Sequence, residues 1–199
     1  TRYGNGVEVY GGCEDYLVKD NYIYQCYDAG ITHQFTSTPD RVRKMVNIRY
    51  LDNLVEYCVY SIEYFLEKLC GDTESYMDGI EMCGNIIRES GYGWGQQRHN
   101  THTPAHIKGW SYENTAKNFE ISDNVFSGAA YRMIHIVAKE EESLPIMRKN
   151  TYAQKNGLML GQYGANHNAE PPILPFDEKV KNVIATTLGE PDANVIVEV

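Results

Sequence analysis

The chain is short of positive charge. Lys and Arg number 18 against 27 Asp and Glu, which gives a formal net charge of −9 in 199 residues. Such a surface repels phosphate backbones and anionic headgroups, so we expect neither nucleic acid nor a membrane surface as partner. An acidic surface is compatible with a neutral carbohydrate or with bound calcium.

Signatures of several protein classes are missing. No apolar run approaches the roughly 20 residues that a bilayer-spanning helix needs. No stretch has the features of a signal peptide. No P-loop, dinucleotide-binding fingerprint or serine nucleophile elbow occurs, which gives no support to nucleotide-dependent enzymes or serine hydrolases. Phe is scarce at 5, whereas Tyr is frequent at 16, and tyrosine suits both strand faces and sugar-binding surfaces.

What the sequence does contain is a repeat centred on asparagine. The pattern Asp20-Asn21-Tyr22-Ile23 returns four times, at steps of about 32, 32, 39 and 26 residues. Apolar residues stand five and three positions before each Asn and two after it. This period-2 spacing on both sides of a polar turn residue indicates short strands that meet at a bend. The repeated asparagines are Asn21, Asn53, Asn85, Asn124 and Asn150.

The repeat predicts a stack of coils. One coil is too small to bury its own apolar side chains, so it packs on the coils above and below it. Asn tolerates the left-handed conformation of a sharp bend, and in register its amide can bond the next Asn along the axis. We therefore predict a ladder of stacked asparagine side chains. The competing interpretation is a β-sandwich in which the Asn spacing is accidental.

With this repeat, residues 6–163 resemble the right-handed parallel β-helix of the pectate-lyase-like superfamily. The resemblance implies an all-β fold: a right-handed, single-stranded parallel β-helix of about five coils over residues 1–163. From residue 164 the repeat stops and three prolines follow, so we expect residues 164–199 to form a C-terminal capping segment. The resemblance favours a secreted or cell-surface location.

The first strand-like segment, residues 7–10, comes almost at the start of the sequence. A bare first coil is an open β edge, which β-helices usually cover. We therefore expect N-terminal coils of a longer chain, or a partner chain, at this end.

Five cysteines leave at least one thiol unpaired within the chain. Cys26 and Cys58 both follow their Asn by five residues, so adjacent coils would bring them within about 4.8 Å. A disulfide is geometrically possible there. We expect a buried pair of free thiols instead, because Cys packs well as a small apolar residue.

One face of the expected coils gathers polar and aromatic side chains. Seven residues after the first four asparagines stand Asp28, Tyr60, Tyr92 and Tyr131, and histidines, amides and a tryptophan follow within a few positions. Sugars bind to such mixtures of aromatic faces and polar groups. The predicted substrate-binding residues are His33, Gln34, Tyr60, Tyr92, Trp94, Gln96, Arg98, Tyr131 and His135.

Three carboxylates are candidates for catalysis. Glycoside hydrolysis needs one protonated and one ionised carboxyl group. Equivalent residues lie about 4.8 Å apart in neighbouring coils and about 10 Å apart in alternate coils. Asp28 is therefore the first candidate, with Glu8 or Glu63 as its partner. On the competing interpretation Asp28 only forms a turn, and Glu8 and Glu63 are solvated strand residues.

Residues 2–8 and 27–34 resemble segments of β-helix glycoside hydrolases. The resemblance implies cleavage of a complex polysaccharide by carboxylates on the coil face, without a cofactor. A polysaccharide lyase is the alternative, with Arg98, Lys108 or Arg132 as the base and Ca²⁺ as an optional ion. A non-catalytic glycan-binding or assembly module is the alternative from another class.

The histidines of the longest insertion do not predict a metal site. His99, His102 and His106 have a spacing that a helix could present to a metal ion, but Thr101, Thr103 and Pro104 oppose a helix there.

Overall fold

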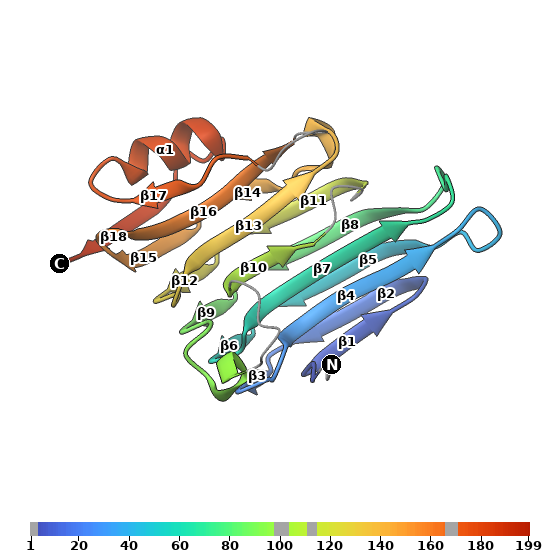
Figure 1. Cartoon of the computed structure of the whole chain (residues 1–199), viewed down its shortest axis with the longest axis horizontal. Helices are drawn as coiled ribbons and strands as arrows, with labels where there is room; N and C mark the ends of the chain where they lie inside the picture. The colour runs from blue at the N-terminus through green and yellow to red at the C-terminus, as the bar shows by residue number, and fades with distance from the viewer. Residues whose placement is uncertain (1–3, 98–103, 111–114, 166–170) are drawn as a thin grey trace.

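The computed structural model describes residues 4–97, 104–110, 115–165 and 171–199. Its strands form three sheets, and in each sheet the neighbour of a strand is the third strand further along the chain, except that β17 lies beside β16 (Figure 1). The pairs are parallel, except that β17 runs antiparallel to β16. The chain therefore winds from sheet to sheet around one axis, as a parallel β-helix does. Its right-handed sense stays a prediction.

Sheet A has seven strands, in the order β1 (Val7–Tyr10), β4 (Ala29–Ser37), β7 (Tyr60–Lys68), β10 (Ala105–Gly109), β13 (Arg132–Ala138), β16 (Leu158–Ala165) and β17 (Leu174–Phe176). Sheet B has five, in the order β14 (Ile146–Arg148), β11 (Ala116–Ser122), β8 (Tyr76–Cys83), β5 (Lys44–Leu51) and β2 (Cys13–Lys19). Sheet C has six, in the order β18 (Asn194–Glu198), β15 (Thr151–Lys155), β12 (Val125–Ser127), β9 (Ile86–Arg88), β6 (Leu54–Glu56) and β3 (Tyr22–Tyr24). The helical elements are η1 (Trp94–Gln97), η2 (Glu141–Ser143) and α1 (Val180–Thr187).

The repeat asparagines form one hydrogen-bonded ladder at the bend between sheets B and C. The Nδ2 group of Asn21 donates to Oδ1 of Asn53 at 3.0 Å, and Asn53 donates to Asn85 at 3.0 Å. The next two steps, to Asn124 and Asn150, measure 2.9 and 3.0 Å. Each Oδ1 also accepts the backbone N–H of the preceding asparagine. The side chains thus tie each coil to the next at the same point.

The left-handed residue at each bend is the one before the asparagine, which corrects the expectation from the sequence. These residues have φ values from 51° to 68°, whereas the asparagines do not have positive φ. Asp and Gly tolerate this conformation better than most residues. The asparagine itself keeps an ordinary backbone conformation, and its side chain hydrogen-bonds to the next asparagine along the axis. The left-handed residues are Asp20, Asp52, Gly84, Asp123 and Lys149.

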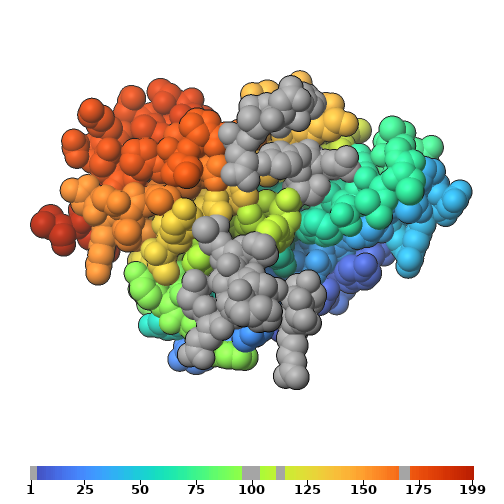
Figure 2. Space-filling model, viewed as in Figure 1, coloured from blue at the N-terminus to red at the C-terminus, as the bar shows by residue number. Residues whose placement is uncertain are grey.

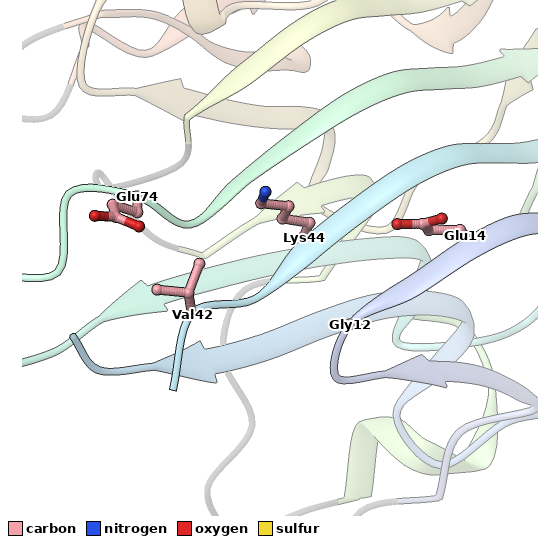
Figure 3. A pocket seen from close by; sticks show the side chains of 5 residues that line it. All are labelled: Gly12, Glu14, Val42, Lys44 and Glu74. Carbon is pink, nitrogen blue, oxygen red and sulfur yellow. The ribbon is translucent and has the colours of Figure 1, made fainter. Parts of the chain in front are cut away.

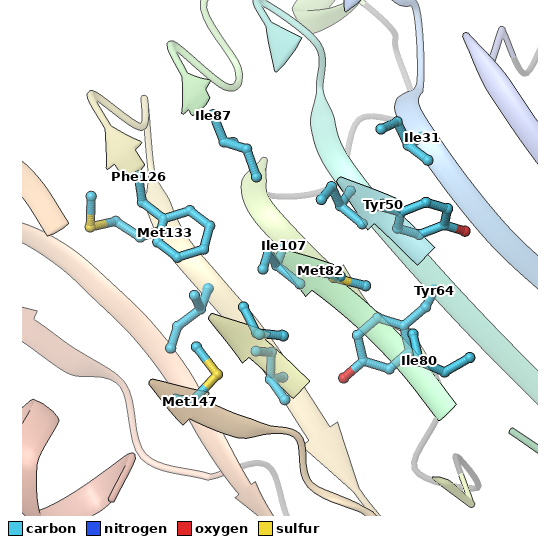
Figure 4. Close-up of a cluster of buried hydrophobic side chains, with 14 of the residues drawn as sticks. Ile31, Tyr50, Tyr64, Ile80, Met82, Ile87, Ile107, Phe126, Met133 and Met147 are labelled. Carbon is cyan, nitrogen blue, oxygen red and sulfur yellow. The ribbon is translucent and has the colours of Figure 1, made fainter. Parts of the chain in front are cut away.

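The apolar columns of the repeat point into the interior between the three sheets (Figure 4). Tyr50 and Met82, three residues before their asparagines, and Ile87 and Phe126, two residues after theirs, are fully buried. Tyr16 is the exception, because it lies on the first described coil and is 42% exposed. Its counterpart Ile48 in the next coil is fully buried. Stacking is therefore what removes these side chains from water.

The C-terminal segment covers the last coil. Glu190 accepts hydrogen bonds from the backbone N–H and the Nδ2 group of Asn150, at 2.6 and 3.0 Å, and from the Tyr152 hydroxyl at 2.7 Å. It therefore takes the place that a further asparagine would occupy. Buried Val180 and Ile184 of α1 belong to the same apolar core as the coils. The segment also contains the strand expected around residues 195–197, β18, which adds a parallel strand to sheet C beside β15.

Figure 2 shows the order of the coils on the surface, from the N-terminal end in blue to the C-terminal end in red. Within the described part of the chain, no helix is long and apolar enough to cross a membrane.

Candidate functional site

The outer face of sheet A carries a row of polar side chains that runs across the coils. Strand pairing places Glu8 opposite Thr32, Thr32 opposite Glu63, and Glu63 opposite Lys108. The row continues through the pairs of Lys108 with His135 and of His135 with Gln162. Except for the exposed Glu8, every member is buried. We call this set the polar row: Glu8, Thr32, Glu63, Lys108, His135 and Gln162.

Glu63 is the most perturbed acid of the row. It is 7% exposed, and its Oε1 accepts a hydrogen bond from the indole N–H of Trp110. Burial raises the pKa of Glu63 to about 7, and the nearby carboxylates of Asp28 and Glu8 add to the shift. The hydrogen bond from Trp110 offsets only part of it. Glu63 therefore holds its proton over a substantial fraction of the time near neutral pH.

Asp28 lies in the bend before β4 and is 4% exposed. Its backbone carbonyl accepts hydrogen bonds from the N–H groups of Val59 and Tyr60, at 3.1 and 3.2 Å. Its carboxylate stands close enough to Glu63 to raise the pKa of that residue. Asp28 therefore combines the two interpretations made from the sequence, since it is a turn residue and also an acid beside a second acid.

Glu8 is held by amides. Its Oε1 accepts from Gln34 Nε2 at 2.9 Å, and its Oε2 accepts from Asn5 Nδ2 at 3.1 Å. Both predicted site residues, Glu8 and Gln34, therefore meet at the outer face. They lie at the exposed N-terminal end of the row. Glu8 on β1 is two strands away from Glu63 on β7, and Gln34 on β4 is one strand away.

The other half of the row is basic. The Lys108 ammonium donates to His135 Nδ1 and lies 4.3 Å from the ring centroid of Trp110. Arg132 donates to Gln162. Burial, together with the charges of Lys108 and Arg132, lowers the pKa of His135 to about 2, so its imidazole is neutral. His135 Nε2 has no hydrogen-bond partner among the described residues. Acidic and basic side chains thus adjoin on one face.

Of the predicted binding residues His33 and Tyr60, only Tyr60 lies on the outer face of sheet A. His33 points into the core, where its Nδ1 is 2.9 Å from the Tyr50 hydroxyl and its ring stacks on Tyr64 at 5.7 Å. This corrects its assignment to a substrate-facing position. Tyr60 does lie on the outer face, with its ring edge-on to Trp110 at 5.4 Å. It is almost fully buried.

The predicted column of Asp28 with three tyrosines does not form. Tyr60 pairs with Ala29 and with Ala105, and Arg132, one residue after Tyr131, continues that register. Tyr131 is half-buried, beside the guanidinium of Arg132. Residues 105–109, which belong to the longest insertion, form β10, the sheet A strand of the third coil.

Tyr92 and Trp94 lie in a turn outside sheet A, with exposed fractions of 54% and 51%. Gln96 lies in η1, and Arg98 lies outside the described residues. Sequence reasoning missed Trp110 as a site residue and considered Lys108 only as the base of a lyase. The alternation of Lys108 and Trp110 with the apolar Ile107 was the signal that could have placed both on the outer face. It does not extend back to His106, which is fully buried, stacks on Phe126 and hydrogen-bonds Ser90.

An open hollow of about 540 Å³ lies elsewhere, on the sheet B side of the molecule (Figure 3). Gly12, Glu14, Val42, Lys44 and Glu74 line it. It contains none of the predicted site residues, and its mixed charges favour no single ligand.

The five cysteines are all free thiols. No group of three or more His, Cys, Asp or Glu side chains is placed to hold a metal ion among the residues that the structure describes. No protein-family model, curated protein or solved structure matches this chain.

Proposed function

We propose that this chain is a carbohydrate-active protein related to the pectate-lyase-like superfamily, and that it hydrolyses glycosidic bonds on the outer face of sheet A. The observation that carries the proposal is Glu63: a buried carboxyl group with a pKa of about 7, beside the carboxylate of Asp28. A general acid at neutral pH needs such a raised pKa, and a second, ionised carboxylate is the other group that glycoside hydrolysis requires.

In this proposal Glu63 donates its proton to the glycosidic oxygen as the bond breaks. Asp28 is ionised and acts in one of two ways. It either bonds to the anomeric carbon, forming an ester that water then hydrolyses, or takes the proton from a water molecule that attacks this carbon. Trp110 orients Glu63 through its indole N–H and presents an aromatic ring beside it. No cofactor takes part.

The basic half of the row favours a second candidate, a polysaccharide lyase. Lys108 and Arg132 would neutralise the carboxylate of a uronate sugar, and one of them would remove the proton beside it. Glu63 would then have no role as an acid toward the glycosidic oxygen. A non-catalytic glycan-binding module remains the third candidate, and it would need neither Glu63 nor Lys108 for turnover.

One assay separates the three. Neutral and acidic polysaccharides are incubated with the wild type, Glu63→Gln, Asp28→Asn and Lys108→Met, and new reducing ends and ultraviolet absorbance of unsaturated sugars are recorded. If the protein is a hydrolase, the wild type forms reducing ends without ultraviolet absorbance. The rate of this reaction should fall about 100-fold or more in Glu63→Gln and in Asp28→Asn. Glu120→Gln, on the outer face of sheet B, is the matched control and should keep full activity.

Absorbance that is lost in Lys108→Met would establish the lyase instead. Binding without either product would leave only the non-catalytic module. Hydrolysis that survives unchanged in Glu63→Gln would contradict the assignment of Glu63.

A further inference from the structure

The turn between β9 and η1 is built to expose aromatic rings. Gly93 and Gly95 flank Trp94 and pack against the neighbouring coils without room for a side chain. A Cβ atom on Gly93 would lie 1.9 Å from the carbonyl oxygen of Tyr57, and one on Gly95 would lie 2.8 Å from Val59 Cγ2. The backbone of the turn therefore packs directly against the neighbouring coils, whereas the Trp94 side chain is 51% exposed.

Hydrogen bonds fix the orientation of the Trp94 ring. Its indole Nε1 donates to the backbone carbonyl of Gln25 at 2.6 Å, and its backbone N–H donates to the Gln25 side chain at 3.0 Å. The ring also packs on Tyr27 with a centroid distance of 4.7 Å. The polar atoms of the indole are thus satisfied, and an apolar ring face is left toward solvent in a fixed position. A ligand that stacks on it loses little side-chain entropy.

A chain of tyrosines continues from this ring onto sheet C. Gln25 Nε2 donates to the Tyr24 hydroxyl at 3.3 Å, and Tyr24 contacts Tyr22 and Tyr57 at centroid distances of 5.9 and 5.6 Å. Tyr22 and Tyr24 are more than half exposed. β3, β6 and β9, which precede these turns, are neighbours in sheet C and lie along the lower edge of the molecule in Figure 1. The aromatic band consists of Tyr22, Tyr24, Tyr27, Tyr57, Tyr92 and Trp94.

The chemistry of the band identifies its ligand class. The band residues are uncharged, and the Arg88 guanidinium beside Tyr22 and Tyr57 is paired with Glu56. The band therefore offers no unpaired positive charge to a polyanion, and the net charge of −9 repels one. Every ring has an apolar face, and the five tyrosines add hydroxyl groups at their tips. The ring faces can pack on the C–H faces of a sugar. The tyrosine hydroxyls and the Gln25 amide can hydrogen-bond to its hydroxyl groups. The band also reaches Tyr27, the residue before Asp28.

We propose that the aromatic band binds a neutral polysaccharide chain. The band lies outside the polar row, so this binding is separate from cleavage at Glu63, although both concern the same class of ligand. A polysaccharide chain laid over Trp94 and Tyr27 would lead toward Asp28, so the band would hold a long substrate beside the reacting carboxylates.

Affinity electrophoresis of the full chain tests the proposal. The protein is run in native gels that contain a galactomannan, a xyloglucan or a mixed-linkage β-glucan, with polygalacturonate as the acidic comparison. We expect at least one neutral polymer to retard the wild type and polygalacturonate not to do so. Trp94→Ala and Tyr24→Ala should each weaken the retardation about tenfold, because exposed aromatic anchors carry most of such binding energy.

Control variants separate binding from folding and from cleavage. Trp94→Phe should retain most of the binding, since it keeps an apolar ring, and Ile146→Ala, a 49% exposed position on sheet B, should bind as the wild type does. Circular dichroism checks the fold of each variant. Glu63→Gln should bind normally even where it abolishes hydrolysis, so a failure of the hydrolase proposal remains distinguishable.

Three outcomes would overturn the proposal. The first is that no neutral polymer retards the protein. The second is that a folded Trp94→Ala binds like the wild type. The third is that the band instead joins two copies of the chain, seen as concentration-dependent sedimentation that Trp94→Ala abolishes.

Discussion

Glu190 stands one coil beyond Asn150 and accepts both its backbone N–H and its side-chain amide. The carboxylate thereby ends the asparagine ladder with the hydrogen bonds that another asparagine would have made. A buried ladder without such an acceptor would leave polar groups unpaired in the last coil.

Glu190→Ala should therefore lower the free energy of unfolding by about 3 kcal/mol, because it leaves the amide groups of Asn150 and the hydroxyl of Tyr152 without their acceptor. Glu190→Gln keeps one acceptor oxygen and should cost about 1 kcal/mol or less. Urea unfolding measures both. Glu178→Ala, an exposed acid just before α1, is the control. Equal stability of Glu190→Ala and the control would show that the ladder needs no terminal acceptor.

An asparagine inside the ladder should contribute more to the free energy of unfolding than the asparagine at its N-terminal end. Asn85 is fully buried and bonds to Asn53, Asn124 and the Tyr50 carbonyl. Asn85→Ala should cost about 3 kcal/mol, because buried donors on both sides lose partners. Asn21→Ala, at an exposed position, should cost about 1 kcal/mol. Denaturant midpoints compare the two. A similar loss at both positions would contradict an axial network.

Glu63 should make the stability depend on pH. Its pKa in the folded protein is about 7 against 4.5 for the free group, so folding favours the protonated form. The contribution of Glu63 to the free energy of unfolding is therefore most favourable below pH 4.5. It becomes less favourable as the pH rises from 4.5 through 7, where the folded protein must bury a charged carboxylate. Glu63→Gln removes this loss.

The variant should therefore exceed the wild type in free energy of unfolding by up to about 3 kcal/mol at pH 9, and differ little at pH 4. Unfolding curves at the two pH values give the comparison. A difference that is the same at both pH values would mean that Glu63 does not titrate in this range.

Gly93→Ala should displace the turn that carries Trp94. The new Cβ would meet the backbone oxygen of Tyr57 at 1.9 Å, and backbone atoms cannot rotate away as a side chain can. We expect a loss of about 2 kcal/mol and a changed tryptophan emission spectrum. Gly12→Ala, whose Cβ would lie 3.4 Å from its nearest neighbour, should change neither. An unaltered spectrum in Gly93→Ala would contradict the rigid placement of the ring.

The asparagine repeat was enough to predict the parallel coils and the ladder, because each asparagine marks the same bend between sheets B and C. It could not predict the outer face of sheet A, because the chain length from that bend to sheet A varies. Ala29 follows Asn21 by eight residues, whereas Ala105 follows Asn85 by twenty. Counting a fixed number of residues from each asparagine therefore put Tyr92 in the place that belongs to Ala105.

The same displacement hid part of the candidate site. Lys108 and Trp110 were assigned to an insertion, so nothing in the sequence showed that they adjoin Glu63. Burial is the first cause of the raised pKa of Glu63, and Trp110 donates a hydrogen bond to its carboxyl group. Asp28, Glu8 and Glu63 were nevertheless recognised as acids of one face, because the segments around them lie in the first two coils, where the spacing is regular.

The titration of Glu63 itself tests the account most directly. Carbon-13 NMR of the side-chain carboxyl group, assigned with Glu63→Gln, should give a pKa of about 7 that falls in Asp28→Asn, since one of the two neighbouring charges is gone. A pKa near 4.5 that does not move in Asp28→Asn would contradict a buried acid poised beside a second carboxylate.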